Sequence, residues 1–191
     1  MVTIRGDTRR PNIVYQVKVC DSAAGMRDEV SVLLASCRLV GNERAIMFCA
    51  TQAHCETMAG HLPSCTIYHS GLTTSEKDDN FASWRSGNAI VMIAPPAFGA
   101  GVDYGAVRLV VHSGPTYGML EYAQGTGRAG RDGKGARAVL LLQKNAHLQN
   151  RQQEEVRAYG LGTTTCSRQA IHLAVDDGES NEKKEDEEEE D

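Results

Sequence analysis

The sequence predicts an α/β domain in which a parallel sheet carries helices on both faces. Three observations favour this fold class. Short, continuously apolar runs alternate with segments of helical periodicity, which is typical of strands buried on both sides. The composition, with 41% hydrophobic and 24% charged residues, is that of a globular protein. A chain of 191 residues is long enough for one full core, with some length left over.

Six apolar runs rich in β-branched residues predict strands, within an expected range of five to seven. They are Ile13–Val19, Ala45–Cys49, Cys65–His69, Ala89–Ile93, Val107–His112 and Ala136–Leu142. We place the domain that contains them at residues 11–160.

Apolar residues at helical spacing predict helices between these strands, at about 26–40, 52–62 and 73–87. Thr73 and Glu76 have the spacing of a capping box, which marks the start of the third helix. Residues 117–124 also have a helical pattern, and a polar surface helix is expected at 145–158.

Both ends of the chain differ from the domain in composition. Residues 1–10 are polar and basic and predict a linker or a truncated edge, and 161–177 predict a partial helical extension. Residues 179–191 carry nine acids and two lysines, a local charge of −7 within a total of −5, which leaves +2 for the remainder. Such an acidic segment (178–191) cannot bury enough apolar surface to fold, so we expect a disordered tail. It could serve solubility or dock over a basic groove.

The sequence predicts no membrane span and no secretion. It lacks an apolar run of eighteen residues, and its start lacks the apolar core of a signal peptide. Six cysteines form no CxxC pair and several fall in apolar runs, which favours reduced thiols in a cytosolic or nuclear protein. The histidines lack zinc-ligand spacing, so no metal site is predicted.

Parallel sheets bind ligands at the carboxyl ends of their strands. The loops expected there are 50–52, 70–72, 94–101 and 113–115, with the segment that carries Arg128 and Arg131 within reach.

That segment, Gln124-Gly-Thr-Gly-Arg-Ala-Gly-Arg-Asp-Gly133, places two arginines three positions apart among glycines and other small residues. Small residues let a backbone approach a ligand closely. The guanidinium fork matches phosphate oxygens in a bidentate way. The segment therefore predicts a site that faces phosphate.

Two other nucleotide-binding patterns are disfavoured. Gly125–Gly130 matches GxGxxG, but a helical pattern precedes it where the dinucleotide fingerprint requires a strand. A Walker A loop is absent, because Gly133-Lys134 is followed by Gly135 in place of Ser or Thr. No acidic box for Mg²⁺ follows a strand. The chain alone therefore shows no means of activating a nucleoside triphosphate.

Six motifs in order resemble the second RecA-like lobe of RecQ-type DNA helicases of superfamily 2, over about residues 9–143. They are Arg10-Pro-Asn-Ile, Ala45-Ile-Met-Phe-Cys-Ala-Thr51, Tyr68-His-Ser-Gly-Leu72, Ala97-Phe-Gly-Ala-Gly-Val-Asp103, Val107-Arg-Leu-Val-Val-His112 and the arginine segment.

The resemblance implies a role in an ATP-dependent 3′–5′ DNA helicase of the nucleus, or of the cytosol in a bacterium. ATP and Mg²⁺ would lie between this lobe and a first RecA-like lobe, which supplies the phosphate loop and the Mg²⁺ carboxylates. Arg131 would be the arginine finger, Arg128 its phosphate-binding or inter-lobe partner, and Gln124 would couple the nucleotide to the lobes. The remaining residues expected at the nucleotide are Gly101, Asp103, Gly127 and Gly130.

DNA contacts are implied for three loops, through hydroxyl and backbone N–H groups. The residues are Thr51, His69, Ser70, Gly71, Phe98 and Gly99. Cys166 resembles the start of the family's four-cysteine zinc subdomain, but the other cysteines are absent, so zinc is not expected.

The sequence departs from the family pattern at four positions, which bears on the grip on DNA. The family usually has Glu at Gly125, Thr at Pro95, Lys at Tyr104 and an Arg near Gln52. A non-catalytic nucleic-acid-binding or regulatory module with the same fold is therefore the alternative function. A small-molecule enzyme is a distant third.

Overall fold

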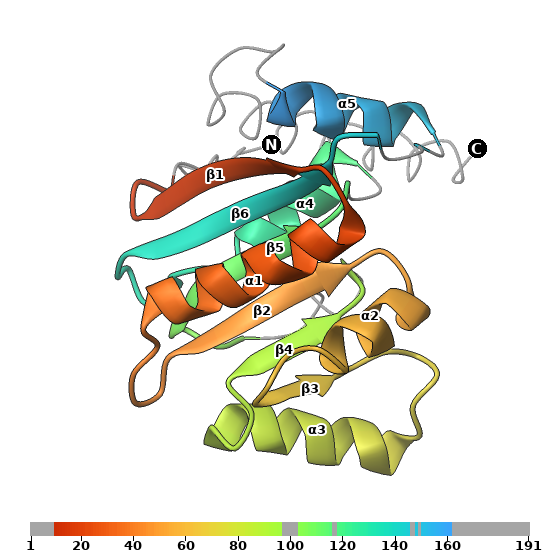
Figure 1. Ribbon diagram of the computed structural model, residues 1–191. Coiled ribbons are helices and arrows are strands. Elements are labelled where there is room, and N and C mark those ends of the chain that lie inside the picture. The colour runs from red at the N-terminus through yellow and green to blue at the C-terminus, as the bar shows by residue number, and fades with distance from the viewer. Residues whose placement is uncertain (1–9, 97–102, 116–117, 146–147, 149, 162–191) are drawn as a thin grey trace, which may run out of the picture.

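Six parallel strands form one sheet in the computed structural model, which describes residues 10–96, 103–115, 118–145, 148 and 150–161. The strand order is β1-β6-β5-β2-β4-β3 (Figure 1). The strands are β1 (Ile13–Cys20), β2 (Arg44–Cys49), β3 (Cys65–Ile67), β4 (Val91–Ala94), β5 (Val107–Ser113) and β6 (Ala136–Gln143). Each predicted strand is confirmed, with ends shifted by up to two residues.

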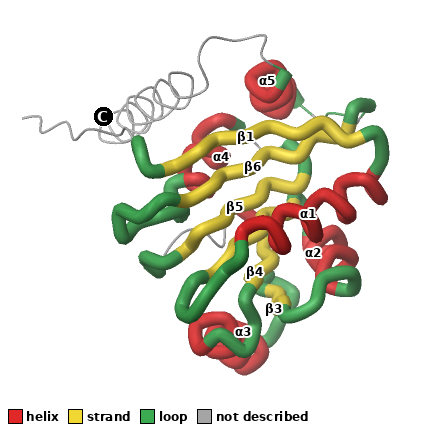
Figure 2. Tube along the Cα trace, turned by 60° about the vertical axis from the view of Figure 1, so that its left-hand side comes forward, coloured by secondary structure: helices red, strands yellow, loops and turns green. Residues whose placement is uncertain are grey.

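Helices cover both faces of the sheet, as predicted (Figure 2). One face carries α1 (Ala23–Cys37) and α2 (Gln52–Ala59), and the other carries α3 (Thr74–Ser86), α4 (Met119–Thr126) and α5 (Arg151–Gly160). No helix in the described part of the chain combines the length and the apolar content needed to cross a bilayer.

Alternate residues of the central strands enter two separate cores. In β2, Ala45, Met47 and Cys49 pack against α1 and α2. Ile46 and Phe48 point to the opposite face, where Trp84 of α3 covers them. Every residue of β2 is buried, which is why its sequence from Ala45 to Cys49 is continuously apolar without a polar alternation.

The first strand pairs in parallel with the last, from Ile13 opposite Ala136 to Cys20 opposite Gln143. The outer edge of β1 is the border of the sheet, and Val14 and Val19 are about half exposed on it.

Helix ends follow local chemistry where the sequence supplies a cap. The capping box of α3 is confirmed, because the Glu76 amide donates to Thr73 Oγ1 (3.3 Å) and the Thr73 amide donates to Glu76 Oε2 (2.8 Å). The first helix begins earlier than expected because Ser22 caps it. It also ends earlier, at Cys37, because Arg38 adopts a left-handed conformation with φ of 46°.

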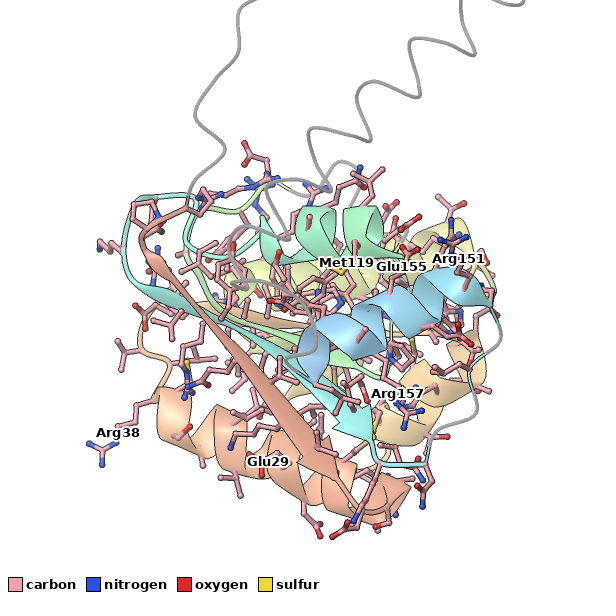
Figure 3. All side chains as sticks on the ribbon, turned by 90° about the horizontal axis from the view of Figure 1, so that it is seen from above. Glu29, Arg38, Met119, Arg151, Glu155 and Arg157 are labelled. Carbon is pink, nitrogen blue, oxygen red and sulfur yellow. The ribbon has the colours of Figure 1, made fainter. Side chains whose placement is uncertain are left out.

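The helix expected as a polar surface element is more deeply packed than its composition suggests. Gln153, Val156 and Tyr159 of α5 are buried, and the two apolar side chains pack on β6. In the view along the sheet, α5 crosses above it, with Arg151 and Glu155 on its outer side (Figure 3). The expected helix near Cys166 and the acidic tail lie outside the described residues.

Arg44 joins the start of β2 to the end of α3. Its guanidinium lies directly beside Gly87, the glycine at the end of that helix. The buried guanidinium donates from Nε to the Trp84 carbonyl (2.6 Å) and from Nη2 to the Arg85 carbonyl (3.2 Å). Gly87 ends the helix with φ of +97°, and a Cβ there would lie 2.6 Å from Arg44 Nη2.

Gly87→Ala should therefore destabilise the fold more than the same substitution at a glycine that has a positive φ but no close contact. Gly114 is the matched control, since its φ is also +97° and nothing lies within 4 Å of its Cβ position. We expect Gly114→Ala to lose about 1–2 kcal/mol of unfolding free energy, and Gly87→Ala to lose about 1–3 kcal/mol more. Urea denaturation measures both, and equal losses would contradict the contact with Arg44.

His112 ends β5 inside a line of aromatic rings and is fully buried. Its ring centroid lies 5.0 Å from that of Phe48 and 4.9 Å from that of Tyr122, which in turn lies 5.4 Å from that of Tyr159. Neither ring nitrogen has a hydrogen-bond partner among the described residues. Burial lowers the pKa of His112 to about 3, so the ring is neutral at pH 7.

Stability should fall in mild acid because of this histidine. In the unfolded chain the His112 ring binds a proton near pH 6.5, whereas in the folded chain it stays neutral until the pH approaches 3. The contribution of His112 to the free energy of unfolding is therefore fully present above pH 6.5 and is lost as the pH falls toward 3. The limiting slope is about 1.4 kcal/mol per pH unit. Urea unfolding of His112→Leu between pH 7 and 5 should show a shallower slope. His61→Gln is the control, because His61 is exposed just after α2.

Candidate functional site

The arginine segment lies at the amino edge of the sheet, where β5 and β6 begin. The Gly130 amide donates to the Val107 carbonyl (2.8 Å), and the Asp132 amide donates to the Gly105 carbonyl (3.3 Å). The expectation that this segment lies within reach of the carboxyl-edge loops is therefore wrong. After β5, helix α4 returns over the face of the sheet, and strands of this length separate the two edges by about 20 Å.

Arg10 holds the arginine segment from the other end of the chain. Its Nη2 donates to the carbonyls of Ala129 (2.7 Å) and Gly130 (3.0 Å), and its Nη1 donates to that of Gly127 (3.2 Å). Three carbonyls of the segment thus point toward one guanidinium. Arg10 belongs with the domain, although the sequence places it in the linker.

Asn12 holds the same segment at its second turn. Its Nδ2 donates to the carbonyls of Gly130 (2.8 Å) and Lys134 (2.9 Å). Gly130 has φ of +55°, and a Cβ there would lie 2.6 Å from both Asn12 Nδ2 and the Lys134 carbonyl oxygen. Only glycine meets both requirements, the left-handed conformation and the close approach.

A buried ion-pair network fixes the end of the segment. Arg108 donates to Glu43 Oε1 (2.9 Å), to Asp132 Oδ1 (2.9 Å) and to Asp132 Oδ2. The hydrogen bonds from Arg108 lower the pKa of Asp132 to about 2. Sequence reasoning missed this network. Its signal is the arginine inside the apolar run 107–112, which a buried strand tolerates only when the charge is paired.

Arg131 projects from the segment toward solvent. Its Nη1 donates to Asp103 Oδ1 (3.1 Å), and its Nε lies 3.4 Å from the Gly127 carbonyl oxygen. The side chain of Arg131 is 31% exposed and that of Asp103 is 89% exposed. Asp103 is thus a weak, solvated partner that an anion with several oxygens can displace or supplement.

Arg128 is half-buried close to Arg131. Burial lowers the pKa of Arg128, and the charge of Arg131 lowers it further. Two guanidinium groups that repel each other are stabilised by an anion between them, and bidentate geometry favours phosphate. Gln124 is exposed on α4, four positions before Arg128.

The structure therefore gathers most of the predicted nucleotide residues at one edge. Gly127 ends α4, Gly130 makes the turn and Asp103 contacts Arg131. Gly101 lies outside the described residues.

A second group of predicted residues lies at the carboxyl edge, between α2 and the end of β3. The Thr51 hydroxyl caps α2 by accepting from the His54 amide (3.1 Å), and the Ser70 hydroxyl accepts from Gln52 Nε2 (2.7 Å). Both residues are exposed. Each hydroxyl oxygen already accepts one bond, so its proton is available to donate to a phosphate oxygen.

Gly71 and His69 support this second group in different ways. A Cβ at Gly71 would lie 2.7 Å from Gln52 Oε1, so the position is close-packed against Gln52. The His69 ring is buried, with its Nε2 3.6 Å from Glu56 Oε1. Only the backbone of His69 can reach a ligand. Phe98 and Gly99 lie outside the described residues.

Two departures from the family pattern have structural counterparts. A Cβ at Gly125 would lie 2.6 Å from His112 Cε1, so the ring fills the space where a longer side chain would begin. Tyr104 donates to the Asn42 carbonyl (2.6 Å), and its ring packs at a tilt against Trp84, with the ring centroids 5.0 Å apart. Gly125 and Tyr104 therefore both contribute to the packing of the domain.

The described residues fit the phosphates of ATP better than its metal ion. The two arginines supply cationic forks, but no group of three His, Cys, Asp or Glu residues that could hold a metal is present in the described ranges. Cys166 falls outside those ranges.

Comparisons with known proteins agree with this geometry. The family model of the helicase conserved C-terminal domain matches residues 28–133. ATP-dependent DNA helicase hus2/rqh1 of Schizosaccharomyces pombe is 31% identical over 150 residues, covering 76% of this chain and 11% of the relative. ATP-dependent DNA helicase Q1 of Mus musculus is 32% identical over 143 residues, covering 73% and 22%. The chain thus spans less than a quarter of the length of either relative.

A solved structure supports the fold. S. cerevisiae Dbp5 bound to RNA and ADP BeF3 superposes with a TM-score of 0.62 at 20% identity, over 85% of this chain and 45% of that one. The sheet and its helices are therefore RecA-like. Since the family model matches more than half of the chain and its relatives are RecQ helicases, the chain belongs to the helicase conserved C-terminal domain family, as a RecQ-type second lobe of superfamily 2.

Proposed function

We propose that the chain is the second motor lobe of an ATP-dependent 3′–5′ DNA helicase and supplies half of the nucleotide site. The observation that carries this proposal is Arg131, projecting beside Arg128 from a turn in which four carbonyls accept hydrogen bonds from Arg10 and Asn12. A first RecA-like lobe, in the same chain or in a partner, would supply the phosphate loop and the Mg²⁺ ligands.

Arg131 would act as the arginine finger on the γ-phosphate. ATP hydrolysis spreads negative charge over the phosphoryl oxygens, and a positioned guanidinium stabilises that charge. Arg128 would hold a neighbouring phosphate oxygen or the first lobe. Asp103 would keep Arg131 oriented before the nucleotide arrives, and Gln124 would contact the nucleotide from α4. Bound ATP with Mg²⁺ supplies the phosphoryl group that is transferred to water.

The exposed hydroxyls of Thr51 and Ser70 would contact the backbone of the DNA strand at the opposite edge. Chain segment 95–106 connects the two edges, because it leaves β4 at the carboxyl edge and enters β5 at the amino edge. The folded body has a charge near +2, so its DNA binding alone should be weak and sensitive to salt.

A non-catalytic nucleic-acid-binding or regulatory module is the second candidate. The packing of Gly125 against His112 favours it, since this packing replaces a polar residue of the family's finger motif. In either case we expect a nuclear protein, because the RecQ relatives come from eukaryotes.

A fusion of this chain to a RecQ first lobe tests the catalytic proposal. DNA-stimulated ATP hydrolysis should appear in the fusion, and Arg131→Ala should reduce kcat by about 10³–10⁵-fold because the transition-state charge loses its partner. Steady-state ATPase assays with single-stranded DNA measure this. Arg151→Ala is the control, since Arg151 is 90% exposed on α5 (Figure 3).

The isolated chain should hydrolyse no ATP. The proposal that the chain supplies half of the nucleotide site would be contradicted by ATP hydrolysis in the isolated chain. It would also be contradicted if the Arg131→Ala fusion kept its full kcat. A fusion that binds DNA but hydrolyses no ATP with Arg131 intact would favour the regulatory module.

Arg10 should be a positioning residue for the finger. Arg10→Ala removes three hydrogen bonds to the arginine segment, so it should lower kcat of the fusion by about 10–100-fold with a smaller change in KM for ATP. The same variant should lose about 1–3 kcal/mol of unfolding free energy. Arg10→Lys should restore part of kcat, and Arg85→Ala, an exposed arginine on α3, is the control. An unchanged kcat in folded Arg10→Ala would exclude the positioning role.

A further inference from the structure

A pocket of about 460 Å³ opens at the carboxyl edge of the sheet, on the edge opposite the arginine site. It lies over the ends of β2 and β5, which are neighbours in the sheet. The chain leaves β2 into α2 on one face and leaves β5 into α4 on the other. This divergence makes a topological switch point, the place where open α/β sheets bind their ligands.

The polar groups of this switch-point pocket favour an anion. Arg27 of α1 lines it and forms no ion pair with any other described residue. His54 lines it from α2, with its Nε2 3.3 Å from Ser113 Oγ. No acidic side chain is among the described residues that line the pocket. A positive group without a nearby carboxylate attracts a negatively charged ligand.

The backbone adds to this preference. The first turns of three helices contribute to the wall of the pocket, through Ala23 of α1, Ala53 of α2 and Gln153 of α5. The amide groups at a helix start carry partial positive charge and favour phosphate. Neither α1 nor α2 has an acidic residue in its first turn to neutralise it.

The wall also contains apolar side chains, so the ligand has an apolar part as well. Ala23 and Ala53, which are exposed, supply this surface together with Pro115, while Met26 and Met58 are buried and expose little of it. Pockets of about 300–1,000 Å³ take whole small molecules, which is far more than one phosphate group needs. A phosphate linked to a flat, largely apolar ring system matches both halves of the pocket.

We propose that the switch-point pocket binds one nucleoside 5′-monophosphate unit, with the phosphate at Arg27 and the base against Ala23, Ala53 and Pro115. The unit could come from a free nucleotide or from the 5′-phosphorylated end of a DNA strand. Thr51 lines the pocket as well as the proposed DNA edge, so a strand end there would lie next to the backbone contacts. The proposal requires neither ATP hydrolysis nor a first lobe.

Isothermal titration of the whole chain with dAMP, deoxyadenosine and inorganic phosphate tests the proposal. We expect dAMP to bind, and both partial ligands to bind at least about ten-fold more weakly. Arg27→Gln should weaken dAMP about ten- to a hundred-fold, since it removes a charge-assisted contact. Ala53→Phe should weaken it too, by filling the pocket without changing a charge. Arg85→Gln should bind dAMP as the unaltered chain does.

Arg131→Ala separates this pocket from the arginine site and should leave dAMP binding unchanged. Loss of binding in Arg131→Ala, equal binding of dAMP and deoxyadenosine, no binding of dAMP, or normal binding by a folded Arg27→Gln would each overturn the proposal. Matched oligonucleotides with a 5′-phosphate or a 5′-hydroxyl identify the source. A preference for the phosphorylated strand that disappears in Arg27→Gln assigns the pocket to strand ends, and equal binding of the two strands, with dAMP bound, assigns it to free nucleotides.

Discussion

The common direction of the six strands is the constraint on which the rest of this molecule depends. Each strand must be followed by a return across a face, so the sheet has two edges of different chemistry. The carboxyl edge collects Thr51, Ser70 and the switch-point pocket. The amino edge collects the arginine segment, because α4 carries the chain back before β6 begins. The two proposed binding sites on this small domain are therefore separated by the length of its strands.

The amino-edge site is precise because its backbone is anchored by residues distant in sequence. Arg10 and Asn12 stand more than a hundred positions before the carbonyls that they bind. Arg108 fixes the end of the same segment through Asp132. In the proposed function, the side chains of Arg128 and Arg131 would then face the phosphates. The glycines allow the backbone conformation of the segment, and the hydrogen bonds from Arg10 and Asn12 stabilise it.

Local chemistry was enough to predict most of the fold. The capping box at Thr73 and Glu76 and the continuous apolar run of β2 depend only on neighbours in sequence, and both are confirmed. The edge at which the arginine segment lies was predicted wrongly, because it depends on the direction of α4 relative to the sheet. Arg44 and Arg108 were missed as anchors for a similar reason. A buried arginine is explained only by the carbonyls and carboxylates that distant segments bring to it.

The pairing of β1 with β6 has a consequence for how the domain is made on the ribosome. The first strand to emerge has its place in the sheet beside the last, so β1 must wait for more than a hundred residues of synthesis before it finds its partner. During that interval its β-branched side chains are exposed, together with two unpaired edges. Contacts this distant in sequence make folding slow. Arg10 and Asn12, which hold the arginine segment, lie just before β1. The proposed nucleotide half-site can therefore form only once β1 has paired with β6.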